Sequence, residues 1–234
     1  MLWKKRKRIT PASKRPNPMI VLSWDAVGSQ DIPALMEFPH FSALMERGAF
    51  CGFVKSVCPS LTYPAHATIV TGRLPIHHGI VNNLRFQPER EKPDWFWQRK
   101  FIRGTTLFDE AEKAGLTTAA LLWPVTAQSR ITYNLPEVWA NRPWQHQLFV
   151  SFFNGSASYE LDLFRRYGSM LDGIRQPMLD NFVQASLLRT FRGYRPDLTM
   201  AHLTDVDTTR HLYGVCSSQA MSALRRQDLR LGGL

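Results

Sequence analysis

Apolar and polar positions along the first part of the chain predict a strand, a helix and a second strand. Residues 19–24 form an apolar run, MIVLSW, that ends at Asp25, and such a run predicts a buried strand followed by a turn. Residues 39–50 place their apolar side chains on one helical face, with Gly48 as the residue that ends the helix. Residues 50–57 alternate, which predicts a second strand.

The same alternation of helices and strands continues toward the end of the chain. Helices are predicted over residues 105–114, 177–191 and 217–234, and strands over residues 116–123 and 197–203. Residues 141–172 are aromatic-rich and less regular, which fits either an insertion over a site or an ordinary surface excursion. Strands that alternate with helices predict the α/β class, with a mostly parallel sheet covered on both faces.

The net charge of +10 is concentrated near the N-terminus. Residues 1–16 hold seven basic residues and no acid, which leaves 22 basic against 19 acidic residues elsewhere. We therefore expect residues 1–18 to be a basic, disordered tail and residues 19–234 to be the folded part. A charge confined to a tail does not predict a specific nucleic-acid partner.

Cysteine usage and apolar runs bear on the cellular location. Cys51, Cys58 and Cys216 are odd in number and have no CxxC spacing, so they predict buried small side chains rather than a disulfide framework or thiolate metal site. Prolines follow the basic run where a secretory signal needs an apolar segment. No apolar stretch approaches the ~20 residues that span a bilayer. We expect a cytoplasmic protein without a membrane span.

Polar side chains follow the predicted strands in three places. They are Asp25, residues 60–66 and residues 205–211. In open α/β sheets, ligands bind at the carboxyl ends of the strands. Each cluster alone is weak evidence, because an aspartate after a strand is equally suited to a turn.

Thr62 admits two interpretations. Pro64 suits the first turn of a helix, which places Thr62 at or beside its N-cap. The local pattern favours a capping threonine, whereas the functional alternative is a hydroxyl that acts where helix N–H groups attract phosphate.

Asp207 and His211, four residues apart, are suitable zinc ligands or a plain surface ion pair.

A longer motif resembles a known family. Residues 62–80, TYPAHATIVTGRLPIHHGI, are similar to the nucleophile segment of the nucleotide pyrophosphatase/phosphodiesterase family, within the alkaline phosphatase superfamily. The similarity extends to residues 81–83, 117–124 and 195–214, nearly the whole chain after the tail. It implies an alkaline-phosphatase-like three-layer α/β/α fold with a mostly parallel central sheet, here the N-terminal part of the domain and incomplete at the C-terminus.

The resemblance implies roles for individual residues. Asp25 and Thr62 would bind one zinc ion, with Thr62 also the nucleophile, and Asp207 and His211 would bind a second. Asn83 would donate to a phosphoryl oxygen. Tyr63 would stack on a nucleobase or aryl leaving group. The implied activity is hydrolysis of phosphodiester or nucleotide pyrophosphate bonds through a threonyl-phosphate intermediate, with a small-molecule substrate.

Several departures from the family pattern leave alternatives open. The later Asp-His pair and further histidine that complete both metal sites are missing after His211, so we expect this chain to be inactive or impaired. Arg210 stands where glycine is usual, and Ala65 where asparagine is usual, which affects substrate contacts near both. The alternatives are a phosphonoacetate-hydrolase-like enzyme and a catalytically dead remnant that binds phosphate compounds.

Overall fold

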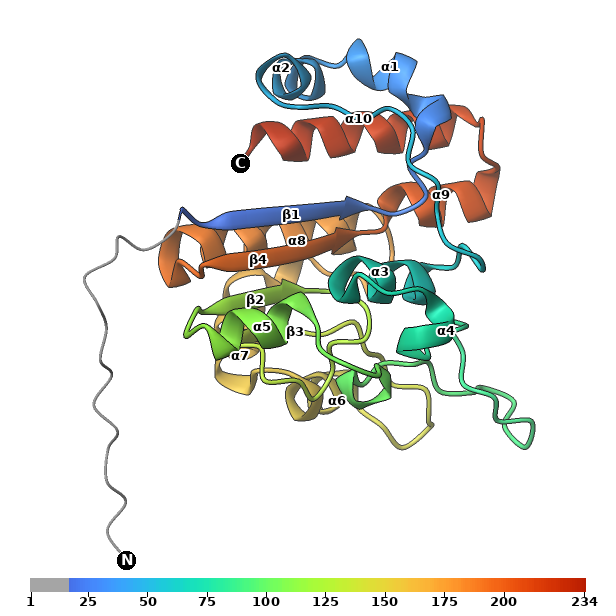
Figure 1. Cartoon of the computed structure of the whole chain (residues 1–234), viewed down its shortest axis with the longest axis vertical. Coiled ribbons are helices and arrows are strands. Elements are labelled where there is room, and N and C mark those ends of the chain that lie inside the picture. The colour runs from blue at the N-terminus through green and yellow to red at the C-terminus, as the bar shows by residue number, and fades with distance from the viewer. Residues whose placement is uncertain (1–16) are drawn as a thin grey trace, which may run out of the picture.

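A parallel sheet forms the centre of the molecule (Figure 1). The structure, a computed structural model, describes residues 17–234. Within them the strands lie in the order β1-β4-β2-β3, and every pairing is parallel. Their bounds are β1 Met19–Trp24, β2 Thr118–Leu121, β3 Tyr133–Leu135 and β4 Leu198–Leu203. Three of these strands match the predicted ones, and β3 is an addition.

Helices cover both faces of the sheet and extend beyond β1. Their bounds are α1 Ile32–Met36, α2 Pro39–Arg47, α3 Thr62–Thr71, α4 Pro75–His78, α5 Leu107–Lys113, α6 Gln147–Asn154, α7 Ala157–Tyr167, α8 Met178–Arg189, α9 Asp205–Tyr213 and α10 Ser218–Gly232. Shorter helical turns occupy Ser29–Asp31, Arg99–Phe101, Gly168–Met170 and Thr190–Tyr194. The helices predicted over 39–50, 105–114, 177–191 and 217–234 correspond to α2, α5, α8 and α10.

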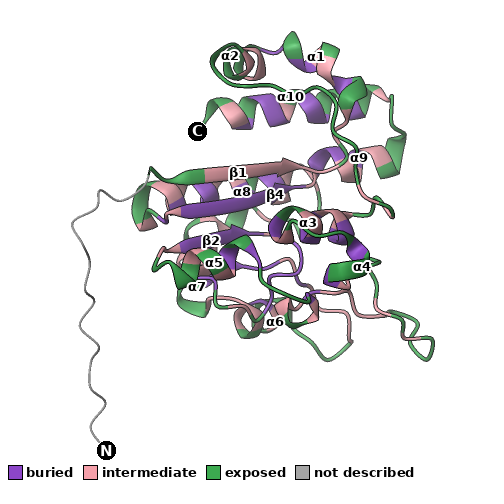
Figure 2. Ribbon diagram, viewed as in Figure 1, coloured by how far each residue is buried: buried purple, intermediate pink, exposed green. Residues whose placement is uncertain are grey.

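Alternate side chains of β4 enter two different cores. Met200 packs with α3 and α5 on one face, whereas Ala201 and Leu203 pack with α7 and α8 on the other. Every residue of β2 and β4 is buried, because helices cover both faces (Figure 2). The structure therefore confirms the predicted α/β/α architecture.

A third core joins the helices that lie beyond β1. It contains Leu35 and Phe38 from the α1–α2 region together with Val206 of α9 and Leu224 of α10. Figure 1 shows α1, α2 and α10 on this side of the sheet. The packing matters for function because α9 carries Asp207 and His211.

Local sequence signals explain where α3 and α5 begin or end. Thr106 and Asp109 form a reciprocal capping box at the start of α5. Gly72 ends α3 with φ 63°, a left-handed conformation that glycine adopts without the steric cost of a Cβ atom. These signals are visible in the sequence, so both helices were predictable.

Two structural predictions are wrong, and one stays open. Residues 50–57 form no strand; Phe53 and Val54 are 85% and 81% exposed, and no neighbouring strand pairs with them among the described residues. Residues 141–172 contain α6 and α7, and their role as an insertion over the site or a surface excursion stays a prediction. The cysteines at positions 51, 58 and 216 are exposed and free rather than buried. The two wrong predictions came from alternation and from residue type, whereas burial depends on tertiary contacts.

Two predictions about location and the tail remain open. The predicted disordered tail, residues 1–18, lies outside the described residues up to position 16, and Asn17 and Pro18 have no regular secondary structure. Among the described helices, none combines the length and the apolar character needed to cross a membrane. The cytoplasmic location stays a prediction.

Candidate functional site

The carboxyl end of β1 and the start of α3 bring the first two predicted residues together. Asp25 directly follows β1, and Thr62 is the first residue of α3. The Thr62 hydroxyl donates a hydrogen bond to Asp25 Oδ2 at 3.2 Å. The residue at the N-cap position is Leu61, and no side chain caps this helix end. The capping interpretation of Thr62 is therefore wrong, and its hydroxyl faces the carboxylate.

His66 supports Thr62 from one turn further along α3. Its Nδ1 lies 2.7 Å from the carbonyl oxygen of Thr62, and its Nε2 lies 2.9 Å from Ser23 Oγ. A carbonyl only accepts hydrogen bonds, so Nδ1 carries the proton and Nε2 accepts from Ser23. Burial and the neighbouring charge of His202 lower the pKa of His66 to about 3. His66 is thus a neutral ring that fixes the first turn of α3.

His202 lies beside the same carboxylate, although no sequence pattern singled it out. It is wholly buried on β4, with Nε2 3.3 Å from Asp25 Oδ2 and Nδ1 3.2 Å from the carbonyl of Leu122. Burial by itself lowers the pKa of His202, but the carboxylates of Asp25 and Glu137 outweigh it and raise that pKa to about 9. His202 is therefore a buried cation next to Asp25.

The interaction with His202 also affects Asp25. Burial by itself would raise the pKa of Asp25, yet the hydrogen bond and charge of His202 and the hydrogen bond from the Thr62 hydroxyl hold it below its usual value. Asp25 is therefore ionised at neutral pH, and its carboxylate is able to accept the proton of the Thr62 hydroxyl.

Glu137 is a second residue that the sequence did not reveal. It follows β3, and its Oε2 lies 3.8 Å from His202 Nδ1 without a hydrogen-bond partner. Burial is the largest cause that raises its pKa to about 7. A carboxylate two residues after a strand was the available signal, but β3 is only three residues long and was not predicted.

Asp207 and His211 form the second predicted pair. They lie on α9 with Asp207 Oδ1 3.3 Å from His211 Nε2, and the His211 side chain is 79% exposed. Burial and the negative charge of Asp25 raise the pKa of Asp207. The two predicted pairs are therefore close enough for their charges to interact.

The start of α9 is held by buried charges. Asp205 is wholly buried and accepts hydrogen bonds from Arg226 and Arg230 of α10 at 2.7 to 2.9 Å. Its backbone N–H donates to Asp180 of α8 at 3.0 Å. Because these contacts connect three helices, they set the place from which Asp207 and His211 project.

The predicted zinc ligands do not complete a metal site in the described part of the chain. Each pair supplies two protein ligands, whereas zinc sites normally have at least three. Residues 17–234 contain no group of three or more His, Cys, Asp or Glu side chains arranged to hold a metal ion. The donor set therefore does not fit zinc by itself.

Tyr63 does not have the predicted role. Its side chain is 0% exposed and packs edge-on against Trp95, with ring centroids 5.2 Å apart. A fully covered ring has no free face, so the predicted stacking of Tyr63 on a nucleobase or aryl group is wrong. Its backbone N–H donates to Asn83 Oδ1 at 2.9 Å. This bond orients the Asn83 amide beside Thr62, and the role of Asn83 toward phosphate stays a prediction.

Two open clefts lie near the covered Tyr63 ring. One, of about 920 Å³, is lined by Trp95, Trp139, Trp144, Arg90 and other residues. The other, of about 690 Å³, shares Trp139 and Trp144. Both combine exposed aromatic faces with basic side chains, a composition suited to planar or anionic groups.

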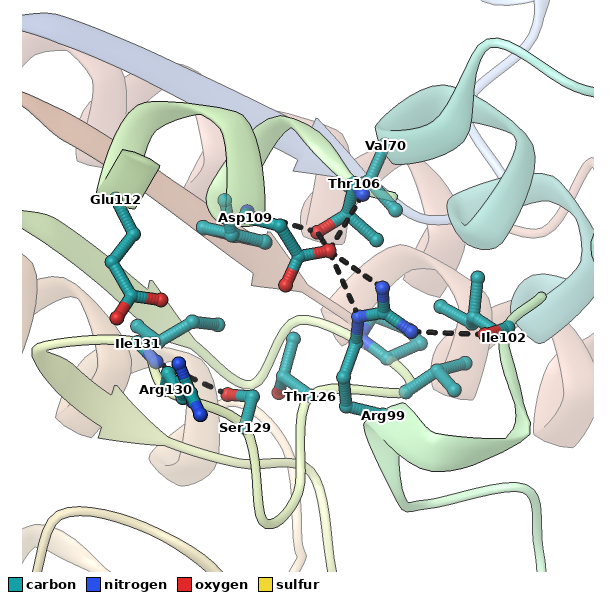
Figure 3. A pocket seen from close by; sticks show the side chains of 13 residues that line it. Val70, Arg99, Ile102, Thr106, Asp109, Glu112, Thr126, Ser129, Arg130 and Ile131 are labelled. Carbon is teal, nitrogen blue, oxygen red and sulfur yellow. Dashed lines mark hydrogen bonds and ion pairs between the residues drawn. The ribbon is translucent and has the colours of Figure 1, made fainter. Parts of the chain in front are cut away.

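A separate cavity behind α3 and α5 is too small to hold a substrate. Its volume is about 10 Å³, roughly the space of one water molecule. Figure 3 shows Arg99 and Asp109 on its wall, joined by an ion pair of 2.5 Å. None of the predicted site residues lines it. Its contacts are structural.

Comparison with known proteins assigns the family. Residues 19–234 match the family model described as type I phosphodiesterase / nucleotide pyrophosphatase. The chain belongs to this family. Members of the family generally depend on metal ions.

Individual relatives agree with this assignment. The chain is 25% identical to human ectonucleotide pyrophosphatase/phosphodiesterase family member 1, over 84% of this chain and 18% of that protein. It is also similar to the solved structure of murine ectonucleotide pyrophosphatase / phosphodiesterase 5, with 25% identity and a TM-score of 0.64, over 93% of this chain and 51% of that one.

Phosphonoacetate hydrolase from Sinorhizobium meliloti shares the fold. Its complex with phosphonoformate has 21% identity and a TM-score of 0.62 with this chain, and the match covers 93% of this chain and 53% of that one. The chain thus spans about half the length of the solved structures that it matches, and less of the human relative. The predicted incompleteness of the domain stays a prediction.

Proposed function

We propose that this chain carries the nucleophile of a hydrolase for phosphodiester or nucleotide pyrophosphate bonds, and that Thr62 is this nucleophile. The observation that carries the proposal is the hydrogen bond from the Thr62 hydroxyl to Asp25 at the start of a ten-residue helix. Thr62 thereby lies at the positive end of the helix dipole, which favours a phosphate group. Family membership and the names of the relatives support the same reaction class.

The reaction would proceed in two steps. Thr62 Oγ1 forms a bond to phosphorus, its proton passes to Asp25, and the ester oxygen of the leaving group departs and is protonated from solvent. Water then cleaves the threonyl-phosphate bond and restores the hydroxyl. Asn83, whose Oδ1 is already bound to the Tyr63 N–H, has its amide N–H groups left to donate to a phosphoryl oxygen.

Zinc dependence is part of the proposal, with the family as its support. Asp25, Thr62, Asp207 and His211 would serve as partial ligand sets. Any further ligands would come from outside the described residues, because those residues do not complete a site.

The proposal is tested with bis(4-nitrophenyl) phosphate and excess zinc. We expect slow release of nitrophenol by the 234-residue chain and a phosphoryl adduct on the peptide that contains Thr62, detected by mass spectrometry. Thr62→Ala should give neither. Equal release by the Thr62→Ala protein, or a phosphoryl adduct on a peptide other than the one that contains Thr62, would contradict the proposal.

A phosphonoacetate hydrolase is the second candidate. The observation in its favour is the complete burial of Tyr63, which removes the predicted aromatic platform beside the nucleophile. The cleft lined by Trp95 and Trp139 offers aromatic surface for an aryl or nucleotide group instead, although neither Asp25 nor Thr62 lines it. Phosphate release from phosphonoacetate, together with no cleavage of nucleotide diesters, would select the second candidate.

A further inference from the structure

A buried ion pair connects α9 to the loop that follows Asp25. Arg210 Nη1 and Nη2 donate to the two carboxylate oxygens of Asp31 at 3.0 and 2.5 Å. The two side chains are only 8% and 7% exposed. The planar guanidinium group therefore binds the carboxylate in the bidentate manner that a lysine cannot reproduce.

The same guanidinium group holds the backbone directly after Asp25. Arg210 Nη1 also donates to the carbonyl oxygen of Ala26. Ala26 has φ 61°, the left-handed conformation, which costs a residue with a Cβ atom about 1 kcal/mol or more. A non-glycine residue keeps such a conformation only where its surroundings impose it, and Arg210 supplies the contact that does so.

The left-handed turn at Ala26 sets the orientation of the Asp25 carboxylate. The Ala26 N–H donates to Asp25 Oδ1 at 3.0 Å, while Oδ2 receives the Thr62 hydroxyl. Each carboxylate oxygen therefore has its own donor. If Ala26 relaxed to a right-handed or extended conformation, its N–H would leave Oδ1, and only the contacts of Oδ2 with Thr62 and His202 would hold the carboxylate.

We propose that Arg210 is a positioning residue that holds the Asp25 carboxylate against Thr62 by fixing Ala26 in its left-handed conformation. The proposal rests on the proposed function, in which Asp25 accepts the proton of Thr62. Arg210 is nearly covered, and its Nη atoms are engaged by Asp31 and Ala26, so it is not a phosphate-binding arginine. Its neighbour His211, by contrast, is largely exposed.

An ion pair that merely stabilises the fold is the competing explanation, and glycine at position 26 separates the two. Glycine adopts positive φ without the Cβ penalty. If Arg210 acts by holding Ala26, then Ala26→Gly should restore part of what Arg210→Met removes. A pair that only adds stability gives no such rescue of the catalytic rate.

The kinetic test compares matched variants in the hydrolysis of bis(4-nitrophenyl) phosphate. Arg210→Met should lower kcat about 10- to 100-fold with KM changed less than about threefold, because a misplaced group costs rate more than binding. The kcat of the Ala26→Gly, Arg210→Met double variant should be at least about threefold higher than that of Arg210→Met. Arg99→Met, which breaks another largely covered ion pair (Figure 3), is the control and should leave kcat unchanged below its melting temperature.

A second measurement does not depend on activity. The NMR backbone chemical shifts of Ala26 distinguish the left-handed from other conformations, and Arg210→Met should move them away from left-handed values. If Arg210→Met does not fold, Asp31→Asn replaces it in this measurement. This milder change keeps an oxygen for the Gly28 N–H, which lies 2.8 Å from Asp31 Oδ2 in the parent. In that variant the shifts should move in the same direction.

The outcomes separate the two proposals. Unchanged Ala26 shifts in both variants would overturn the positioning role of Arg210, whatever the activity. Altered shifts together with equal hydrolysis by the parent and the Thr62→Ala protein would overturn the proposed function and leave the hold of Arg210 on Ala26 standing. A loss of kcat in Arg210→Met that Ala26→Gly does not rescue would show a structural ion pair and also overturn the positioning role.

Discussion

The hydroxyl of Thr62 and the carboxylate of Asp25 lie 3.2 Å apart, although 37 positions separate the residues in the chain. Asp25 directly follows β1 and Thr62 begins α3, so both lie at the carboxyl edge of the parallel sheet. This arrangement gives the hydroxyl a proton acceptor and places it at the positive end of a helix dipole, which favours phosphate.

Thr62→Ala should remove activity with little effect on stability. We expect the rate of diester hydrolysis to fall by about 1,000-fold or more, because no nucleophile remains. The free energy of unfolding should change by less than about 1 kcal/mol, because the hydroxyl bonds to Asp25 rather than to a helix N–H. Hydrolysis rates in excess zinc measure the first effect, and urea unfolding curves measure the second.

Thr62→Ser is the matched control for the nucleophile. It keeps the hydroxyl, so a measurable part of the parent rate should remain, whereas Thr62→Ala should not be rescued by added zinc. A Thr62→Ala protein with near-parent turnover and a clearly lower melting temperature would instead indicate a purely structural threonine.

The architecture was predictable where helices and strands have strong local signals. Thr106 with Asp109 marks the start of α5, and the apolar run before Asp25 marks β1. The segment around Phe53 has an alternating pattern but no strand to pair with in the described structure, and sequence periodicity does not contain that information. Strand formation depends on a partner as well as on the pattern.

The candidate site was predictable only in part. Asp25, Thr62, Asp207 and His211 stand in recognisable motifs, and the structure brings them together in pairs. His202 lies in the middle of a buried strand, where a lone histidine has no distinguishing pattern. Its role follows only from the distance of 3.3 Å to Asp25, which depends on the register between β1 and β4.

The purified chain should hold zinc weakly. Each predicted pair offers two protein ligands, and stable zinc sites normally have three or four. After dialysis we expect clearly less than one zinc ion per chain by elemental analysis. His211→Ala should lower the zinc taken up from excess, whereas His77→Ala, at an exposed position, should not. Stoichiometric zinc that survives dialysis would show that the ligand set is larger than the described residues indicate.

All three cysteines should react with a thiol reagent in the native protein. Cys51, Cys58 and Cys216 are exposed and free in the structure. We expect Ellman's reagent to titrate three thiols per chain without denaturant, at rates close to those in urea. Replacement of each cysteine by serine should remove one equivalent. A thiol that reacts only after unfolding would show that the residue is buried, as the sequence had suggested.

Glu160 should make the stability of the protein depend on pH. Its side chain is 0% exposed, Ser151 donates to Oε2, and Oε1 has no hydrogen-bond partner. Burial raises the pKa of Glu160 from 4.5 to about 7, although the bond from Ser151 opposes this. Between these two pH values the folded protein keeps a proton that the unfolded chain has lost, so the free energy of unfolding falls as the pH rises.

Glu160→Gln tests this effect because the amide stays neutral and still offers an oxygen to Ser151. The variant should match the parent near pH 4.5 and exceed it at pH 8 by an unfolding free energy on the order of 3 kcal/mol. Urea unfolding at several pH values measures the difference in unfolding free energy between the two proteins. The contributions of the other titrating groups are the same in both proteins and cancel in this difference. Glu37→Gln, at an exposed position, controls for the lost charge and should show no such divergence. Parallel pH profiles for the parent and Glu160→Gln would mean that the buried carboxyl group ionises at its ordinary pKa.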